Sequence, residues 1–170
     1  DAANRLTHLI KSLGKASHQA LEPVSKEWVP LLLAYAAAGK SGDSSTDEGD
    51  GVTSSVISRV GGKAYRTVLQ EWLAFLSGCK GARGLYKAGE LQVAVASQAD
   101  SDEPGVQAAA LRCLAAFKVK ALGQHLERML RLTDNKTLRE ELASFPLAPG
   151  AEGGVSGEHR PVLLPLMARV

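Results

Sequence analysis

Apolar residues recur along most of the chain at the spacing expected of amphipathic helices. A helix with 3.6 residues per turn places residues three and four apart on one face, and seven segments show this pattern. In chain order, the predicted faces comprise Leu6, Leu9, Ile10 and Leu13; Val29, Leu32, Leu33 and Ala36; Tyr65, Val68, Leu69, Trp72 and Leu76; Val106, Ala110, Cys113, Leu114 and Phe117; Leu122, Leu126, Met129 and Leu130; Leu138, Leu142 and Phe145; and Val162, Leu163, Leu166, Met167 and Val170.

Glycine and proline mark several predicted helix boundaries. Gly14 is a plausible stop for the first helix. The second helix is predicted over residues 28–38, where Pro30 falls in the first turn and removes no intrahelical hydrogen bond. Near the end of the chain, Pro161 and Pro165 should bend the last helix or delay its start.

Polar residues indicate where two of the later helices begin. Ser101 and Asp102 are candidate caps for the helix that follows, and Pro104 suits its first turn. Thr137 and Glu140 have the spacing of a capping box. We therefore expect both helix starts to be fixed by side-chain hydrogen bonds.

One segment, residues 85–99, is ambiguous in its periodicity. Leu91, Val93 and Val95 alternate as in a strand, whereas Leu91 and Val95 also lie one helical turn apart. Its alanine content and its length favour a helix. The chain is therefore predicted to contain seven or eight helices and no convincing strand.

A polar segment interrupts the helical pattern early in the chain. Residues 39–55 are rich in Gly, Ser, Asp and Thr, with almost no apolar residue, so we predict a disordered loop. Its length favours an insertion on the surface of a repeat. The predicted organisation is a helical repeat segment over 1–38, the loop over 39–58, and HEAT-like repeats over 59–170.

The predicted helices recur at a regular interval. Those that hold Val29, Val68 and Val106 are 38 or 39 residues apart, close to the helical-pair repeat of HEAT and armadillo proteins. The chain opens on Asp1 and stops at Val170 within an apolar run, which favours a fragment of a longer superhelix. We therefore predict an all-α, α-solenoid fold; a single closed helical bundle is the alternative.

Composition excludes several classes of protein. The longest apolar run, residues 31–38, is far shorter than the roughly 20 residues that span a bilayer, and no targeting signal is visible. We therefore predict a soluble chain that does not associate with a membrane. Cys79 and Cys113 have no cysteine or histidine at metal-ligand spacing, so neither a disulfide framework nor a zinc site is expected.

Positive charge is concentrated in one part of the chain, although the net charge is only +2. Residues 59–87 contain six cations and one acidic residue, Glu71. Lysines and arginines beside glycines can follow a phosphate backbone, so these cations are candidates for contacts with RNA or a partner. A solvated helix face and loop is the competing interpretation. The candidates are Arg59, Lys63, Arg66, Lys80, Arg83 and Lys87.

Residue patterns typical of catalysis or of cofactor binding are weak. The four histidines share no helical face, and the triplet 158–160 (EHR) points in three directions on a helix, so we expect it to orient a turn. The glycine-rich segment 150–157 lacks the lysine and the preceding strand of a phosphate-binding loop. We therefore expect no enzyme activity, cofactor or small-molecule substrate; a small helical enzyme is the weakest alternative. The aromatic residues Trp28, Trp72, Phe75 and Phe117 lie on apolar faces and should pack in the core.

Several segments, taken in order, carry a resemblance to one family. They are 63–77 (KAYRTVLQEWLAFLS), 85–87 (LYK) with 90–91 (EL), 103–107 (EPGVQ), 110–114 (ALRCL), 138–142 (LREEL) with Phe145, and 158–165 (EHRPVLLP). Their order and spacing resemble the "down-regulated in metastasis" family of U3 small nucleolar RNA-associated proteins, over about residues 63–170. These are very large HEAT-repeat subunits of the small-subunit processome.

The resemblance implies a function that periodicity alone does not supply. It implies a non-catalytic scaffold in the nucleus and nucleolus, required for pre-ribosomal RNA processing and for biogenesis of the small ribosomal subunit. The implied partners are processome proteins, together with pre-ribosomal RNA or the U3 small nucleolar RNA. A generic HEAT-repeat adaptor of another large assembly is the alternative, because it would share the periodicity without the ordered motifs.

Overall fold

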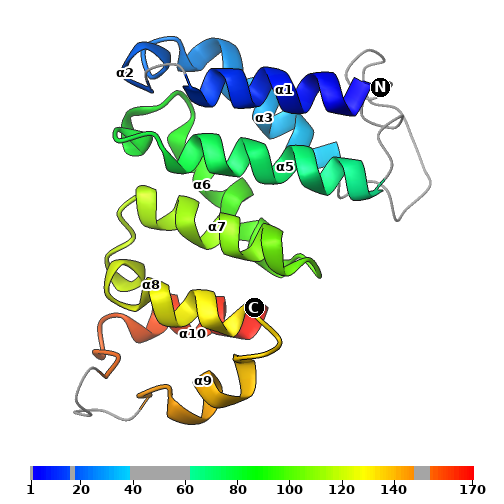
Figure 1. The fold of residues 1–170 in the computed structure, drawn as a ribbon. Helices are drawn as coiled ribbons and strands as arrows, with labels where there is room; N and C mark the ends of the chain where they lie inside the picture. Colours follow the sequence, from blue (N-terminus) through cyan, green and yellow to red (C-terminus); the bar gives the residue numbers. More distant parts are fainter. Residues whose placement is uncertain (1, 16–17, 39–61, 148–153) are drawn as a thin grey trace, which may run out of the picture. The chain divides into compact units, whose positions relative to one another are not determined.

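The described part of the protein is helical throughout. The computed structural model describes residues 2–15, 18–38, 62–147 and 154–170, and within these ranges it contains helices and no strand (Figure 1). The all-α prediction is thus confirmed for these residues, whose paired helices are of the α-solenoid kind. The loop predicted over 39–58 lies outside the described residues. Contacts divide the chain into two compact units, Asp1–Ala94 and Val95–Val170.

The first unit is built around two parallel helices. Helix α1 (Ala2–Lys15) and helix α5 (Gly62–Ser77) run side by side in the same direction (Figure 1). An ion pair of 3.2 Å between Lys11 Nζ and Glu71 Oε1 joins their middles. A shallow groove of about 320 Å³ lies where both helices end, lined by Gly14 and Lys15 of α1 and by Ser77 of α5.

Helix α3 (Ser25–Ala38) runs antiparallel to α5. Near the start of α3, the Trp28 ring lies 5.0 Å from the ring of Phe75, which is close to the end of α5. Near the end of α3, Tyr35 stacks at 4.9 Å on Tyr65, which is close to the start of α5. A short helix, α2 (His18–Leu21), precedes α3.

These directions correct the predicted repeat. Equivalent helices of a solenoid run parallel to one another, whereas Val29 and Val68 lie on the antiparallel helices α3 and α5. The parallel counterpart of α5 is α1 (Figure 1). The interval from Val29 to Val68 therefore joins two helices that are not equivalent.

The boundaries of α3 differ from those predicted. The helix begins at Ser25, so Pro30 lies inside it and is not in its first turn. Pro30 is exposed on the helix surface, where water can bind the carbonyl group that loses its backbone donor. The predicted face is otherwise right, since Val29, Leu32 and Ala36 are buried.

The first unit continues beyond α5 into the ambiguous segment. A 3₁₀ helix, η2 (Ala82–Gly84), leads to α6 (Ala88–Ala96), in which the first unit ends at Ala94. A second 3₁₀ helix, η3 (Ser97–Asp100), belongs to the second unit. The helical interpretation of residues 85–99 is confirmed. Leu91 and Val95, one turn apart, are buried, whereas Val93 between them is 71% exposed, as helical periodicity requires.

The second unit contains four helices. Its elements after η3 are α7 (Pro104–Ala116), α8 (Lys120–Leu132), α9 (Leu138–Ser144) and α10 (Arg160–Arg169). Helices α7 and α8 form a tight antiparallel hairpin in which Lys118 adopts the left-handed conformation, with φ 55° (Figure 1). The face predicted for α7, from Val106 to Phe117, is buried as expected.

The predicted helix starts of this unit are partly wrong. Glu103 precedes α7 without a side-chain cap, and Ser101 Oγ instead accepts the Glu103 backbone N–H at 3.3 Å; Pro104 does occupy the first turn. Thr137 makes no capping box, because its backbone is already helical and its N–H donates to the Asp134 carbonyl at 3.0 Å; its hydroxyl donates to the Arg131 carbonyl at 2.7 Å. Helix α10 begins at Arg160, so its two prolines do not delay it.

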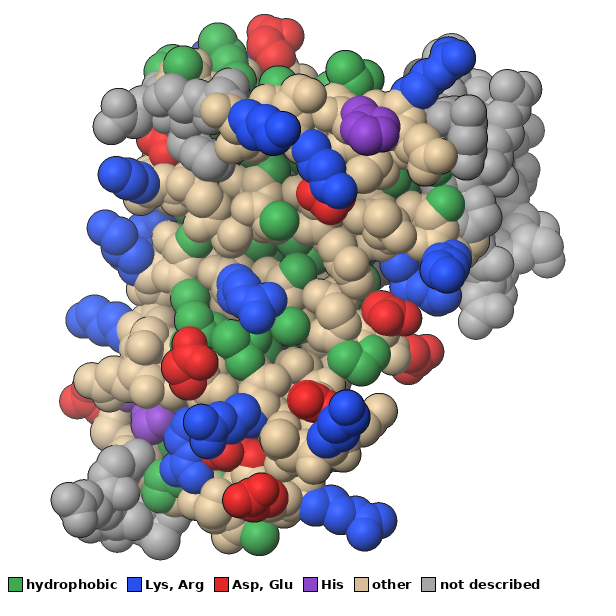
Figure 2. All heavy atoms as spheres, viewed as in Figure 1, with side chains coloured by type: hydrophobic (Ala, Val, Ile, Leu, Met, Phe, Trp, Pro, Cys, Tyr) green, Lys and Arg blue, Asp and Glu red, His purple; other side chains and the backbone are tan. Residues whose placement is uncertain are grey.

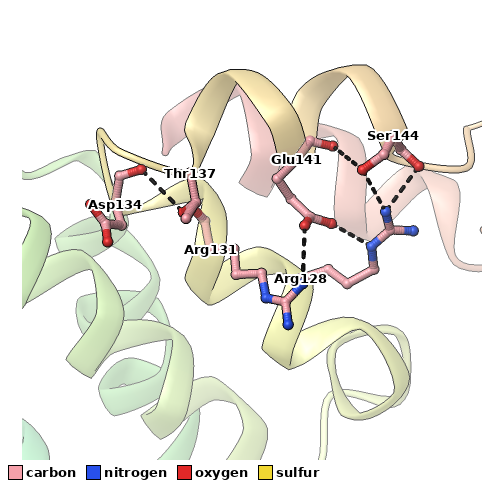
Figure 3. A network of polar contacts seen from close by, with 6 residues as sticks. All are labelled: Arg128, Arg131, Asp134, Thr137, Glu141 and Ser144. Atoms are coloured by element: carbon pink, nitrogen blue, oxygen red, sulfur yellow. Dashed lines mark hydrogen bonds and ion pairs between the residues drawn. The ribbon is translucent and has the colours of Figure 1, made fainter.

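A buried carboxylate joins α8 to α9 (Figure 3). Glu141, only 5% exposed, accepts a hydrogen bond from Arg128 Nε and lies 3.7 Å from Arg131 Nη1. Arg128 also donates to the Ser144 carbonyl at 2.9 Å, and its guanidinium lies 4.9 Å from the Phe145 ring centroid. The predicted face of α9 is therefore rotated, since Leu142 is 52% exposed and Glu141 takes the inner position.

Candidate partner and nucleic-acid interface

The predicted basic residues do not form one site. Lys63 and Arg66 lie near the start of α5, whereas Lys80, Arg83 and Lys87 follow its end. A helix of 16 residues is about 24 Å long, so the two groups lie at opposite ends of the first unit. Arg59 lies outside the described residues. The second group is the larger, and its three residues lie on one short loop.

This basic loop, residues 78–87, alternates between buried and exposed positions with a period of three. Cys79, Ala82 and Leu85 point inward and are at most 5% exposed. The residues that directly follow them along the chain are all exposed; they are Lys80, Arg83 and Tyr86. The 3₁₀ helix η2 occupies the centre of the loop and contains Arg83, while Lys80 and Tyr86 flank it along the chain.

Two hydrogen bonds to neighbouring segments hold the backbone of the basic loop. The Gly81 N–H donates to Glu22 Oε1 at 3.0 Å, and the Tyr86 N–H donates to Ser25 Oγ at 3.1 Å. A side chain at position 81 would meet the same carboxylate, because an added Cβ would lie 2.7 Å from Glu22 Oε2. The loop is thus a fixed platform, tied to the segment that precedes α3.

The buried thiol of Cys79, within the basic loop, shows that the inner side of the loop is apolar. Cys79 Sγ donates weakly to the Phe75 carbonyl at 3.9 Å. Burial, with a smaller contribution from the Glu22 carboxylate, raises the pKa of Cys79 to about 11. The inner side of the loop is therefore apolar, and its charged side chains are exposed to solvent.

Lys87, the last residue of the basic loop, is already paired. Its ammonium lies 3.0 Å from Glu90 Oε2, and this hydrogen bond raises the lysine pKa. Both side chains are well exposed, so the pair contributes little to stability. Lys87 also adopts a left-handed conformation, with φ 51°, at the start of α6. Its charge is thus less available to a ligand than that of Lys80.

The space-filling view shows where the charges lie. Lys and Arg side chains gather along the edge of the first unit at which α5 ends (Figure 2). The C-terminal end of a helix carries a partial negative charge, which favours cations there. The edge can therefore hold several positive charges close to one another and present them to a polyanion or to an acidic surface.

Tyr86 is the residue that the sequence analysis missed at this site. This residue is 38% exposed, unlike Trp28, Trp72, Phe75 and Phe117, which are all buried in agreement with the prediction. The segment LYK was noted as part of a family motif, but the tyrosine was not a candidate for binding. The signal that could have found it is the three-residue alternation through Cys79, Ala82 and Leu85.

The other residues that could bind a metal ion or take part in catalysis are dispersed or buried. Over the described ranges, no three His, Cys, Asp or Glu side chains are grouped so as to hold a metal ion. Nor does any helix of the described residues have the length and apolar character to cross a membrane. Within the triplet 158–160, His159 precedes α10 and Arg160 donates a hydrogen bond to the Leu147 carbonyl, so this segment fixes a turn.

Comparisons with known proteins identify the chain. Paired amphipathic helices with an exposed basic loop define a helical-repeat protein. The family model described as U3 small nucleolar RNA-associated protein 20, N-terminal, matches residues 63–170, well over half of the chain. The chain belongs to this family, and the resemblance seen in its motifs is confirmed over the predicted residues. Searches of curated proteins and of solved structures gave no match.

Family membership supports a coarse assignment of function. It supports a role in the small-subunit processome and in ribosome biogenesis, an association with processome components, and a nuclear or nucleolar location. The matched residues include α5, the basic loop and the whole second unit. The platform described above is therefore part of the family's shared segment.

Proposed function

We propose that this chain acts as a non-catalytic scaffold of the small-subunit processome in the nucleolus. In this role it is needed for pre-ribosomal RNA processing, and it binds processome proteins together with pre-ribosomal RNA or the U3 small nucleolar RNA. The observation that carries the proposal is the family match over residues 63–170. HEAT-like helix pairs also suit a scaffold, because stacked pairs offer extended surfaces to large partners.

The surfaces of both units support binding in preference to catalysis. The hollow between α1 and α5 is open and shallow, unlike the enclosed sites that bury small ligands. Exposed apolar side chains occur instead on several helices, including Leu31 of α3 and Val93 of α6. His125 and the triplet 158–160 take part in packing and turn formation within the second unit.

Affinity capture from nucleolar extract tests this proposal. The tagged 170-residue chain should recover small-subunit processome proteins, and depletion of the protein in cells should make precursors of the small-subunit RNA accumulate. A variant with a disrupted core, Leu69→Asp, is the matched negative control, because Leu69 is 2% exposed in α5. Recovery of an unrelated transport or signalling assembly, without processome proteins, would instead identify a generic helical-repeat adaptor.

The non-catalytic character needs its own test. Alanine substitutions at Glu158, His159 and Arg160 should alter the stability of the second unit without abolishing a reaction, since Arg160 ties α10 to the Leu147 carbonyl. Helicity measured by circular dichroism separates loss of folding from loss of function. A turnover that disappears in these variants while helicity is retained would contradict the scaffold assignment.

A further inference from the structure

The basic loop presents an aromatic ring among cations, and this combination suits one kind of ligand. Single-stranded nucleic acid binds where positive side chains track the phosphates and exposed aromatic rings stack on the bases. Among the exposed residues of the loop, Lys80 and Arg83 supply positive charge, and Tyr86, which is 38% exposed, supplies an aromatic ring. A duplex hides its bases within the stack, so it could use the charges but not the ring.

The geometry points to a single-stranded RNA site on the basic loop, in which Lys80 and Arg83 contact phosphates and Tyr86 stacks on an unpaired base. This site would be one of the places where the scaffold holds RNA, so it rests on the proposed function. The inference names both the class of ligand and the residue that selects unpaired strands.

The anchoring of the loop favours this role. Buried Cys79, Ala82 and Leu85 fix the inner side of the loop. The Ser25 hydroxyl holds the backbone of Tyr86, so the exposed ring is attached to an ordered segment. A preorganised loop loses little conformational entropy on binding, which leaves more of the stacking and charge interactions for affinity.

Two carboxylates near the loop are bonded to other groups. Glu22 accepts the Gly81 N–H through Oε1, and Glu90 pairs with Lys87 through Oε2. Both acidic groups therefore have partners within the loop or next to it. Figure 2 shows further Lys and Arg side chains along an edge of the first unit.

Fluorescence anisotropy with a labelled single-stranded oligouridine, and with an RNA duplex of the same length, tests the inference. The wild-type chain should bind the single strand more tightly. Tyr86→Ala should weaken single-strand binding by about tenfold or more, as expected when one base loses its stacking partner. Tyr86→Phe keeps the ring and should bind as the wild type does.

Charge reversal separates the loop from the rest of the basic surface. Lys80→Glu should weaken binding and make the slope of log affinity against log salt shallower by about 0.7, the value for one phosphate contact on a single strand. Lys63→Glu is the matched control, since it makes the same charge change at the other end of α5. Equal losses for both variants would overturn the site, and so would unchanged binding of Tyr86→Ala.

Failure of the RNA-site inference can be distinguished from failure of the scaffold proposal. If the wild-type chain recovers processome proteins but binds neither RNA probe, the scaffold proposal stands and the RNA site is wrong. If Tyr86→Ala loses processome proteins while its RNA binding is unchanged, the loop is a protein-binding surface, and the RNA site is again wrong. If Tyr86→Ala loses RNA but keeps its helicity and its protein partners, the site is supported.

Discussion

Different kinds of interaction join the helices within each of the two units. In the first unit the contacts between α3 and α5 are aromatic, with Trp28 edge-on to Phe75 and the phenol groups of Tyr35 and Tyr65 donating to each other's backbone carbonyl. In the second unit α8 and α9 meet through the buried carboxylate of Glu141. The contact between α3 and α5 depends on burial of aromatic surface, and the contact between α8 and α9 depends also on paired charges.

This difference predicts how each unit responds to its surroundings. Aromatic burial changes little with pH, because the groups involved do not titrate near neutrality; burial, with a smaller effect of Tyr65, raises the pKa of Tyr35 far above that range. Buried charges and imidazoles are stabilising only in one protonation state. The first unit should therefore tolerate acid better than the second.

The largest expected effect comes from the aromatic core of the first unit. Trp72 is 4% exposed in α5, and its ring centroid lies 6.1 Å from that of Phe75. Trp72→Ala should lower the free energy of unfolding by about 3–5 kcal/mol, through lost burial and the cavity left behind. Urea denaturation followed by circular dichroism measures the change. Val93→Ala, at an exposed position of α6, should change it by less than about 0.5 kcal/mol.

The buried carboxylate of the second unit should have the next largest effect. Glu141→Gln keeps the shape of the side chain but removes the charge that Arg128 and Arg131 face, and should cost about 2 kcal/mol. Both arginines reach solvent, which keeps the cost below that of a fully buried pair. The matched control is Glu140→Gln, one residue earlier on the exposed side of α9. Equal stabilities of the two variants would show that the ion pairs are not important.

The smallest expected effect is a pH dependence confined to the second unit. His125 on α8 is 5% exposed, and its Nε2 has no hydrogen-bond partner. Burial, followed by the charges of His159 and Arg128, lowers its pKa below the ordinary value of 6.5. The unfolded chain then binds the proton more readily than the folded one.

The sign of this pH dependence follows from the lowered pKa. The stabilising contribution of neutral His125 is complete above about pH 6.5 and is lost as the pH falls from there through the lowered pKa. Unfolding free energies measured between neutral and acidic pH should decline less steeply for His125→Leu than for the wild type. His8→Gln, exposed on α1, should leave the slope unchanged. An NMR titration that finds the His125 pKa at or above 6.5 would contradict this account.

Periodicity predicted the helices better than their caps or their partners. Faces such as Val106 to Phe117 are buried as expected, because apolar spacing is a local property of the sequence. The capping box at Thr137 failed because the backbone of this residue is already helical, with φ −104° and ψ −13°, whereas a capping residue is normally extended. The face of α9 failed for a non-local reason, since Glu141 turns inward to meet two arginines of α8. Apolar spacing alone does not reveal such a pairing.

The candidate site was predicted in part. Segregation of charge along the sequence drew attention to the cations of residues 59–87, but their distribution in space depends on the length of α5, which separates Lys63 from Lys80. Tyr86 was missed because a period of three belongs neither to a strand nor to an α-helix. A charge count says which residues are basic, whereas the structure says which of them share a surface.

The reactivity of the Cys79 thiol can be used to measure how often the basic loop opens. With a pKa of about 11, its thiol is almost entirely protonated at neutral pH, and its burial, with the residue only 2% exposed, keeps reagents away. An alkylating agent can then reach the sulfur chiefly when the loop lifts from α5. The rate at which this sulfur is consumed would count those openings, and a ligand bound across the loop would slow it.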